Sequence, residues 1–106
     1  MRRSAEFSTV LRSGVRARRG LLVVHHRTGF GTGTATVGLV VGRSVGGSVV
    51  RHRVSRRLRA QLALRLDVLA PGSAIVVRAL PGAGTATSTE LGADLDAALS
   101  RSARSR

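Results

Sequence analysis

The sequence predicts an α+β fold in which helices pack on a single β-sheet. The prediction rests on two hydrophobic periods. Apolar residues recur at helical spacing after residue 48 and again after residue 87, whereas short β-prone runs lie between and before these segments. With 106 residues and 42 % apolar content, the chain is long enough for one domain with a modest core.

The first half of the chain predicts a helix followed by two strands. A short helix is expected over residues 4–13, followed by a basic connector over residues 15–20. Two β-prone runs then occupy residues 21–26 and 34–42. The glycine-rich residues 28–33 between them are typical of a hairpin loop.

The second half predicts a helix, a strand and a helix. The first of these helices should begin near Ser48 and last until about Leu69, because Pro71 and the glycine after it forbid continuation. Residues 73–80 are nearly all apolar, which is typical of a central, buried strand. The chain after this strand is expected to form a short loop.

A capping box opens the last predicted helix, because Thr87 is followed three residues later by Glu90. The stripe of this helix is Leu91, Leu95 and Leu99. Residues 100–106 are expected to be a frayed basic tail, and the whole of residues 1–106 is expected to be one domain.

The charge of the chain points to a polyanionic partner. The formal net charge is +13, and every basic residue is arginine. Residues 1–65 hold 14 arginines against the single acid Glu6, whereas residues 66–106 hold four of each sign. The positive field therefore belongs to the first two thirds of the chain, and nucleic acid is the expected partner.

The most informative segment is residues 49–59, in which five arginines occur and no acid separates them. Helical spacing predicts one buried stripe, formed by Val50, Val54, Leu58, Leu62 and Leu66. The arginines expected to project from the opposite side are Arg53, Arg56, Arg57 and Arg59. Like charges at this spacing repel, so the face costs stability unless a polyanion offsets it. Guanidinium forks are suited to phosphate.

Other kinds of chemistry find little support. His25 and His26 are adjacent on a strand, point to opposite faces and cannot ligate one ion together. The glycine-rich residues 29–33 and 42–46 lack the spacing of nucleotide-binding loops. Cysteine is absent, which excludes disulfides and thiolate metal sites.

The longest apolar runs, such as residues 37–41, are far too short to span a bilayer. A cytoplasmic location is expected.

Residues 37–59 read VGLVVGRSVGGSVVRHRVSRRLR. This run resembles, without a gap, the signature of the bacterial ribonuclease P protein component, roughly V-G-x-x-V-S/G-K-K/S-V-G-N-A-V-x-R-N-R-x-K-R-x-x-R. Residues 6–14 look like the first helix of that family, and residues 74–81 look like its late strand. The resemblance covers most of the chain.

The resemblance implies a single α-β-β-β-α-β-α domain, with helices packed on a central sheet and a left-handed crossover, although crossovers are usually right-handed. It also implies a protein subunit that assists a catalytic RNA in removing the 5′ leader of precursor tRNA. Magnesium ions would be held mainly by the RNA. No catalytic residue, no membrane association and no protein partner are expected for the protein.

Two sets of site residues follow from the resemblance. The set implied to bind the catalytic RNA is Arg43, Arg51, His52, Arg53, Arg56, Arg57 and Arg59. A cleft between the first helix and the sheet is implied to hold the single-stranded leader, and its residues would be Phe7, Leu11, Arg12, Leu22, Val24 and His25. Because few rings are available for stacking, leader affinity is expected to rest more on Arg12, Arg16, Arg18 and Arg19.

The chain departs from the family pattern at three positions of the arginine segment. His52 stands where the family usually has Asn, Gly47 replaces the Asn of the G-N-A motif, and Ser55 replaces a common lysine. These departures bear on the strength of RNA binding.

Three other classes of protein are weighed against this interpretation. A ribosomal or ribosome-assembly protein would share the basic charge, but would not stimulate cleavage of precursor tRNA by a catalytic RNA. A DNA-binding module would place the arginine helix in a major groove and compete for duplex DNA. A membrane-surface peptide would need an amphipathic helix without a folded domain, and the buried strand at residues 74–77 argues against it.

Overall fold

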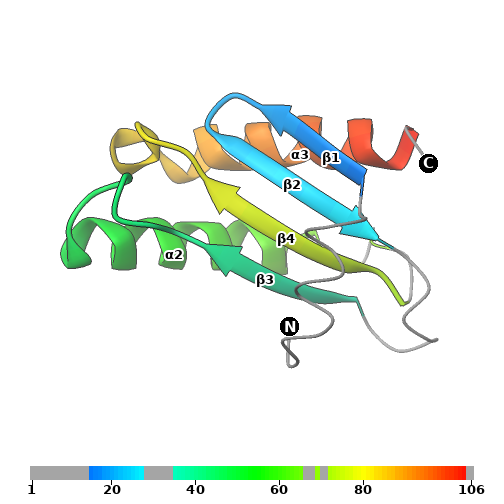
Figure 1. The fold of residues 1–106 in the computed structure, drawn as a ribbon, viewed down its shortest axis with the longest axis horizontal. Helices are drawn as coiled ribbons and strands as arrows, with labels where there is room; N and C mark the ends of the chain where they lie inside the picture. Colours follow the sequence, from blue (N-terminus) through cyan, green and yellow to red (C-terminus); the bar gives the residue numbers. More distant parts are fainter. Residues whose placement is uncertain (1–14, 28–34, 66–68, 70–71, 105–106) are drawn as a thin grey trace.

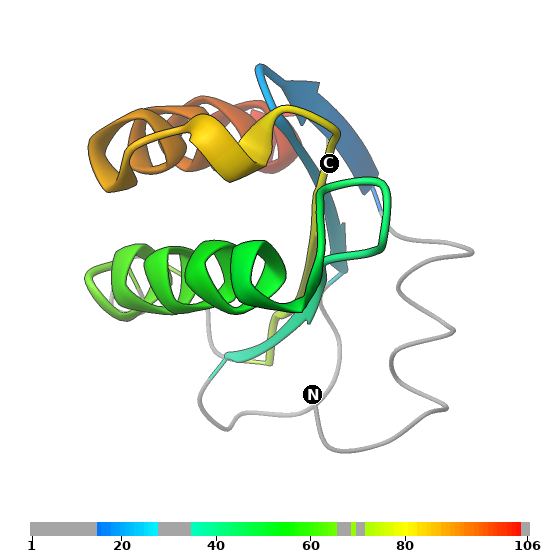
Figure 2. The same ribbon diagram turned by 90° about the vertical axis from the view of Figure 1, so that its left-hand side faces the viewer.

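The computed structural model describes residues 15–27, 35–65, 69 and 72–104 of the chain. Within these residues the elements in chain order are β1 (Val15–Arg19), β2 (Leu22–Arg27), β3 (Thr36–Val40), α2 (Ser48–Ala63), β4 (Ala74–Ala79), the 3₁₀ helix η2 (Ala83–Thr85) and α3 (Ser88–Arg104). The four strands form one sheet, and both α-helices cover the same face of it (Figures 1 and 2). The predicted α+β class is confirmed. The helix expected at residues 4–13 lies outside the described residues.

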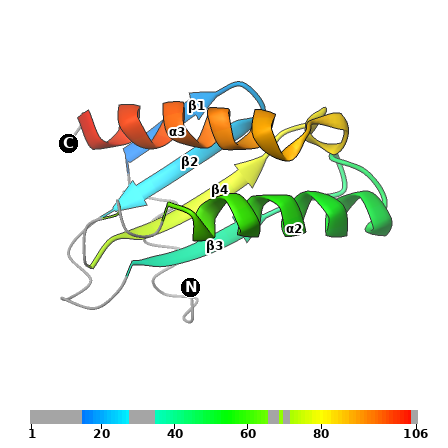
Figure 3. The same cartoon turned by 180° about the vertical axis from the view of Figure 1, so that it is seen from behind.

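The sheet is mixed, with strand order β1-β2-β4-β3. β1 and β4 each pair antiparallel with β2, whereas β3 pairs parallel with β4. The connection from β3 through α2 to β4 is therefore a crossover. With the helices toward the viewer and these two strands pointing right, β4 lies above β3, so the crossover is left-handed (Figure 3). This feature, which the family resemblance implied, is confirmed.

Two local predictions for the first half of the chain are wrong. Residues 15–19, expected as a connector, form the edge strand β1, which turns into β2 through Gly20 at φ +56°. The main chain of Leu21 is held at this turn, where its N–H donates to Asp94 Oδ2 at 3.0 Å. The hairpin expected between β2 and β3 does not exist, because β4 lies between these two strands.

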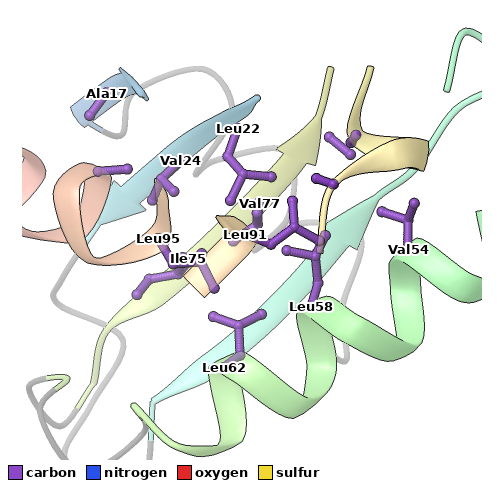
Figure 4. Close-up of a cluster of buried hydrophobic side chains, with 14 residues drawn as sticks. Ala17, Leu22, Val24, Val54, Leu58, Leu62, Ile75, Val77, Leu91 and Leu95 are labelled. Atoms are coloured by element: carbon purple, nitrogen blue, oxygen red, sulfur yellow. The ribbon is translucent and has the colours of Figure 1, made fainter. Parts of the chain in front are cut away.

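The core lies between the helix-covered face of the sheet and the two helices (Figure 4). Along β2, Leu22 and Val24 point into this core, and Ile75 and Val77 do so from β4. The helices contribute regularly spaced apolar residues, which are Val54, Leu58, Leu62, Leu91 and Leu95. The buried stripes predicted from helical spacing are thus confirmed at these positions.

The helix ends differ from prediction in two places, whereas the start of α2 at Ser48 agrees with it. α2 ends at Ala63 rather than near Leu69, and its N-cap is Gly47, which has no side chain to cap the exposed amides. α3 continues to Arg104, through residues expected to be frayed. The capping box is confirmed, because the N–H of Thr87 donates to Glu90 Oε1 at 2.8 Å and the N–H of Glu90 donates to Thr87 Oγ1 at 3.1 Å.

No helix in the described part of the chain is long and apolar enough to cross a membrane.

Candidate nucleic-acid interface

The buried stripe of α2 divides the polar residues of this helix into two flanks and an outer side. Val54, Leu58 and Leu62 face the core. At 100° per residue, Arg53 and Arg57 fall on the flank toward η2, whereas Arg51 and its neighbours at helical spacing fall on the other flank. The five arginines of residues 51–59 therefore do not form one uniform face.

Arg53 and Arg57 are bound to the protein itself. Arg53 Nη2 donates to the carbonyl oxygen of Gly84 at 2.9 Å, and Arg57 Nη1 donates to that of Ala86 at 2.6 Å. Both side chains are half-buried. The prediction that these two arginines project from the side opposite the buried stripe is therefore wrong, because each guanidinium group donates a hydrogen bond to a backbone carbonyl of the segment before α3.

The segment after β4 packs closely against α2 at the same place. Ala83 and Gly84 are buried, and a Cβ atom added to Gly84 would lie 2.7 Å from Val50 Cγ1 and 3.3 Å from the carbonyl oxygen of Val45. Only glycine leaves enough space for this approach. The two arginine hydrogen bonds and this close contact together hold η2 on the first half of α2.

The outer side and the other flank of α2 remain cationic. Arg56, Arg59 and His52 are exposed, and so is Arg43 in the loop before the helix. Among the described residues, the salt bridge between Arg65 and Asp96 lies further along α2 and does not involve these exposed side chains. This side of α2 thus presents positive charge to solvent, without a recorded carboxylate partner among the described residues.

A pocket of about 260 Å³ lies beside the exposed flank of α2. Its lining residues are Val41, Ser48, Arg51, His52, Ser55 and Arg59. Arg51 is half-buried, and its Nε has no hydrogen-bond partner among the described residues. The sequence singled out three of these residues as RNA contacts but not Ser48 or Ser55, because a serine in a helix carries no signal without the fold.

Arg65, which the sequence did not single out, links the end of α2 to α3. Its Nε and Nη2 donate to the two carboxylate oxygens of Asp96 at 2.6 and 3.1 Å, and its Nη1 donates to the Gln61 carbonyl and side-chain oxygens. The hydrogen bond from Arg65 lowers the pKa of Asp96, and the same bond raises the pKa of Arg65. This arginine is thus neutralised by the protein's own carboxylate.

Opposite the helices, the other face of the sheet carries a second cationic group. Strand register places Arg16 opposite His25, and Arg18 and Arg78 on either side of Val23. These three arginines are exposed, whereas His25 is 9 % exposed. Burial lowers the pKa of His25, and the charges of Arg16 and Arg78 lower it further.

The sequence-based leader cleft is corrected by this arrangement. Leu22 and Val24 are fully buried in the core beneath the helices, so they cannot contact an RNA strand. His25 lies on the opposite face, with Val23 as its apolar neighbour on that face. Because side chains alternate along a strand, Leu22 and Val24 point to one face of β2 and His25 points to the other. The sequence alone could therefore have excluded a cleft that all three residues share. Phe7, Leu11 and Arg12 lie outside the described residues.

The described residues offer no metal centre. No group of three or more His, Asp or Glu side chains lies together among them. The carboxylates of α3 have other partners, since Asp94 accepts the N–H of Leu21 and Asp96 pairs with Arg65.

The described residues thus form a small α+β fold with two cationic surfaces, one on α2 and one on the other face of the sheet. A family model described as Ribonuclease P matches residues 1–103. The chain belongs to the ribonuclease P protein family, and is thus of the type that forms the protein subunit of the endoribonuclease that processes tRNA 5′ ends.

Individual relatives agree with this assignment. The chain is 50 % identical to the ribonuclease P protein component of Streptomyces bikiniensis over 109 residues, covering 95 % of this chain and 89 % of the relative. It is 52 % identical to that of Mycobacterium sp. strain KMS over 102 residues, covering 95 % and 86 %. These names favour the ribonuclease P interpretation over a ribosomal protein.

Solved structures show the same fold at low sequence identity. The RNase P protein of Staphylococcus aureus matches with a TM-score of 0.84 at 19 % identity, covering 95 % of this chain and 92 % of that one. The RNase P protein of Thermotoga maritima matches with a TM-score of 0.82 at 22 % identity, covering 95 % and 94 %.

Proposed function

We propose that this protein binds the catalytic RNA of ribonuclease P through the exposed side of α2. The observation that supports the proposal is that Arg56 and Arg59 are exposed with no recorded carboxylate partner among the described residues, and His52 and Arg43 lie exposed beside them. Fixed guanidinium groups bind phosphate oxygens, and such contacts recognise folded RNA with little regard to sequence.

The other face of the sheet is proposed to bind the 5′ leader of precursor tRNA. Arg16, Arg18 and Arg78 are exposed on this face, and strand register places them beside the buried side chains of Val23 and His25. A cationic surface suits the phosphates of an unpaired strand. In this role Arg78 joins the arginines of β1, whereas Val23 is as buried as Leu22 and Val24.

Magnesium is proposed to be held by the RNA. The described residues do not fit a magnesium site, because their carboxylates are few, and Asp94 and Asp96 are engaged by the protein itself. The contribution of the protein would then be to place and hold RNA, with the chemistry supplied by RNA-bound ions. The cytoplasm is the proposed location, since precursor tRNA is processed there in bacteria.

Reconstitution tests this function. The protein should stimulate cleavage of precursor tRNA by a cognate catalytic RNA at low magnesium concentration, where RNA alone is weakest. A ribosomal or ribosome-assembly protein of equal charge provides the control, and should not stimulate. Equal rates with either protein would reject the proposed function.

The α2 contact can be tested separately through the salt dependence of binding. Each lost phosphate contact reduces the slope of log affinity against log salt concentration by about 0.7 to 0.9. We expect R56Q and R59Q each to reduce the slope by about this amount. An unchanged slope in both variants would count against this contact surface.

A further inference from the structure

The turn between β1 and β2 is held by a carboxylate of α3. Asp94 is half-buried, and its Oδ2 accepts the N–H of Leu21, 73 residues away in the sequence, at 3.0 Å. A Cβ atom added to the neighbouring Gly20 would collide with the same carboxylate, so the turn lies directly against it. The Leu21 carbonyl accepts the N–H of Leu80, the residue after β4, at 2.9 Å. The turn is thus fixed to α3 and to the end of β4.

β1 has few other attachments to the rest of the protein. It is an edge strand that pairs with β2 alone in the described sheet. Of its described side chains, only Ala17 is buried. α3 is the helix that lies over β1 and β2 (Figures 2 and 3). The contact of the turn with α3 therefore has a large share in setting where β1 lies.

The position of β1 matters because its exposed arginines share the open face of the sheet with an arginine of another strand. Arg16 and Arg18 belong to β1 and Arg78 belongs to β4, with β2 between them. Two strand spacings, or about 10 Å, separate β1 from β4. One RNA strand can contact both positions only while this spacing is kept, and a spacing that exists before binding costs less entropy.

We propose that Asp94 is a positioning residue for the leader of precursor tRNA, because it holds the turn at Gly20 and Leu21 and so keeps Arg16 and Arg18 in place beside Arg78. Asp94 does not touch the leader itself, since α3 covers the opposite face of the sheet (Figure 2). The inference rests on the proposed function and deepens it. It adds a residue whose negative charge would by itself oppose RNA binding.

Two precursor tRNAs test this role in the holoenzyme reconstituted with its catalytic RNA. One carries a leader long enough to cross the sheet, and the other carries a leader of a single nucleotide. D94A should raise KM for the long-leader precursor about fivefold, without changing kcat or the KM of the short-leader precursor. D94N keeps an oxygen that can accept the N–H of Leu21, so its rise in KM should be smaller.

D96A is the matched control, because it removes the same charge from the same helix but breaks a different contact, that with Arg65. We expect D96A to keep the wild-type KM for both precursors. Loss of a negative charge alone favours RNA binding, so a higher KM in D94A cannot come from the change of charge. Equal KM values in D94A and D96A would overturn the inference. Equal rises for both precursors, or in D94A and D94N, would also overturn it.

G20A tests the same contact without any change of charge and serves if D94A does not fold. Its Cβ would displace the turn from the Asp94 carboxylate, so the KM of the long-leader precursor should again rise selectively. A wild-type KM for that precursor in G20A would overturn the inference. Failure of the proposed function would look different, because the wild-type holoenzyme would then show the same KM for both precursors.

Discussion

Arg57 on α2 donates a 2.6 Å hydrogen bond from Nη1 to the backbone carbonyl oxygen of Ala86, just before α3. One turn earlier, Arg53 makes the equivalent bond to Gly84. Two residues that look like RNA contacts in the sequence therefore link α2 to the segment that leads into α3. The charge of these guanidinium groups still adds to the positive field, but their donors are partly occupied.

Substitution of Arg57 should separate this structural role from RNA binding. We expect R57A to lower the free energy of unfolding by about 1–3 kcal/mol, because the half-buried carbonyl of Ala86 loses a charged donor. R59A is the matched control and should change stability by less than about 0.5 kcal/mol. Urea unfolding measures both, and equal stability of the two variants would contradict the role assigned to Arg57.

Gly84 provides a test of the contact between η2 and α2. G84A should destabilise the protein by about 1–3 kcal/mol, since its Cβ would lie 2.7 Å from Val50 Cγ1. In the G84A/V50A double variant the space is restored, so the combined loss should be smaller than the sum of the two single losses. Strictly additive losses would show that the contact with Val50 is not the cause.

The Arg65–Asp96 pair should affect stability at low pH. Folding lowers the pKa of Asp96, so its stabilising effect is full above the ordinary carboxyl pKa and is lost as the pH falls through the lower, folded-state pKa. The Asp96 side chain is 64 % exposed, so we expect D96N to cost less than about 1 kcal/mol at pH 7. Urea unfolding between pH 7 and pH 2 should show a smaller acid loss in D96N than in the wild type. Parallel curves would contradict the prediction.

His25 should stay neutral to a lower pH than an ordinary histidine. Burial and the charges of Arg16 and Arg78 lower its pKa, so folding stability falls as the pH drops below the usual histidine value. R78Q removes one of these charges and should raise the pKa of His25 toward normal. NMR titration of the imidazole measures this, with R43Q as the control. An equal pKa in wild type and R78Q would exclude the proposed effect of Arg78.

The sequence predicted those elements in which the spacing of apolar residues directly reflects which side chains are buried. The helical stripe through Val54 and Leu58 and the all-apolar strand β4 belong to this kind, as does the capping box of α3. It did not predict β1, because three arginines among five residues hide the alternation around Ala17. Strand pairing was also beyond the sequence, since β4 reaches its place between β2 and β3 only through long-range contacts.

The sequence identified the charged segment of the candidate site, but it did not predict how the side chains of that segment are arranged in space. Arg53 and Arg57 find their acceptors 31 and 29 residues away in the sequence, a distance at which no local pattern reports a partner. On β2, treating Leu22, Val24 and His25 as one cleft ignored the fact that neighbouring residues face opposite sides. Exposed Arg56 and Arg59 are where the helical pattern expected them.

The central position of β4 has a consequence for biosynthesis. β4 is the last strand to leave the ribosome, yet it is the only partner of β3 and the inner partner of β2 in the described sheet. A nascent chain that ends before Ala74 can form the β1–β2 hairpin but leaves β3 without a neighbour. The sheet, and with it the platform under α2, is therefore completed only after β4 has been synthesised.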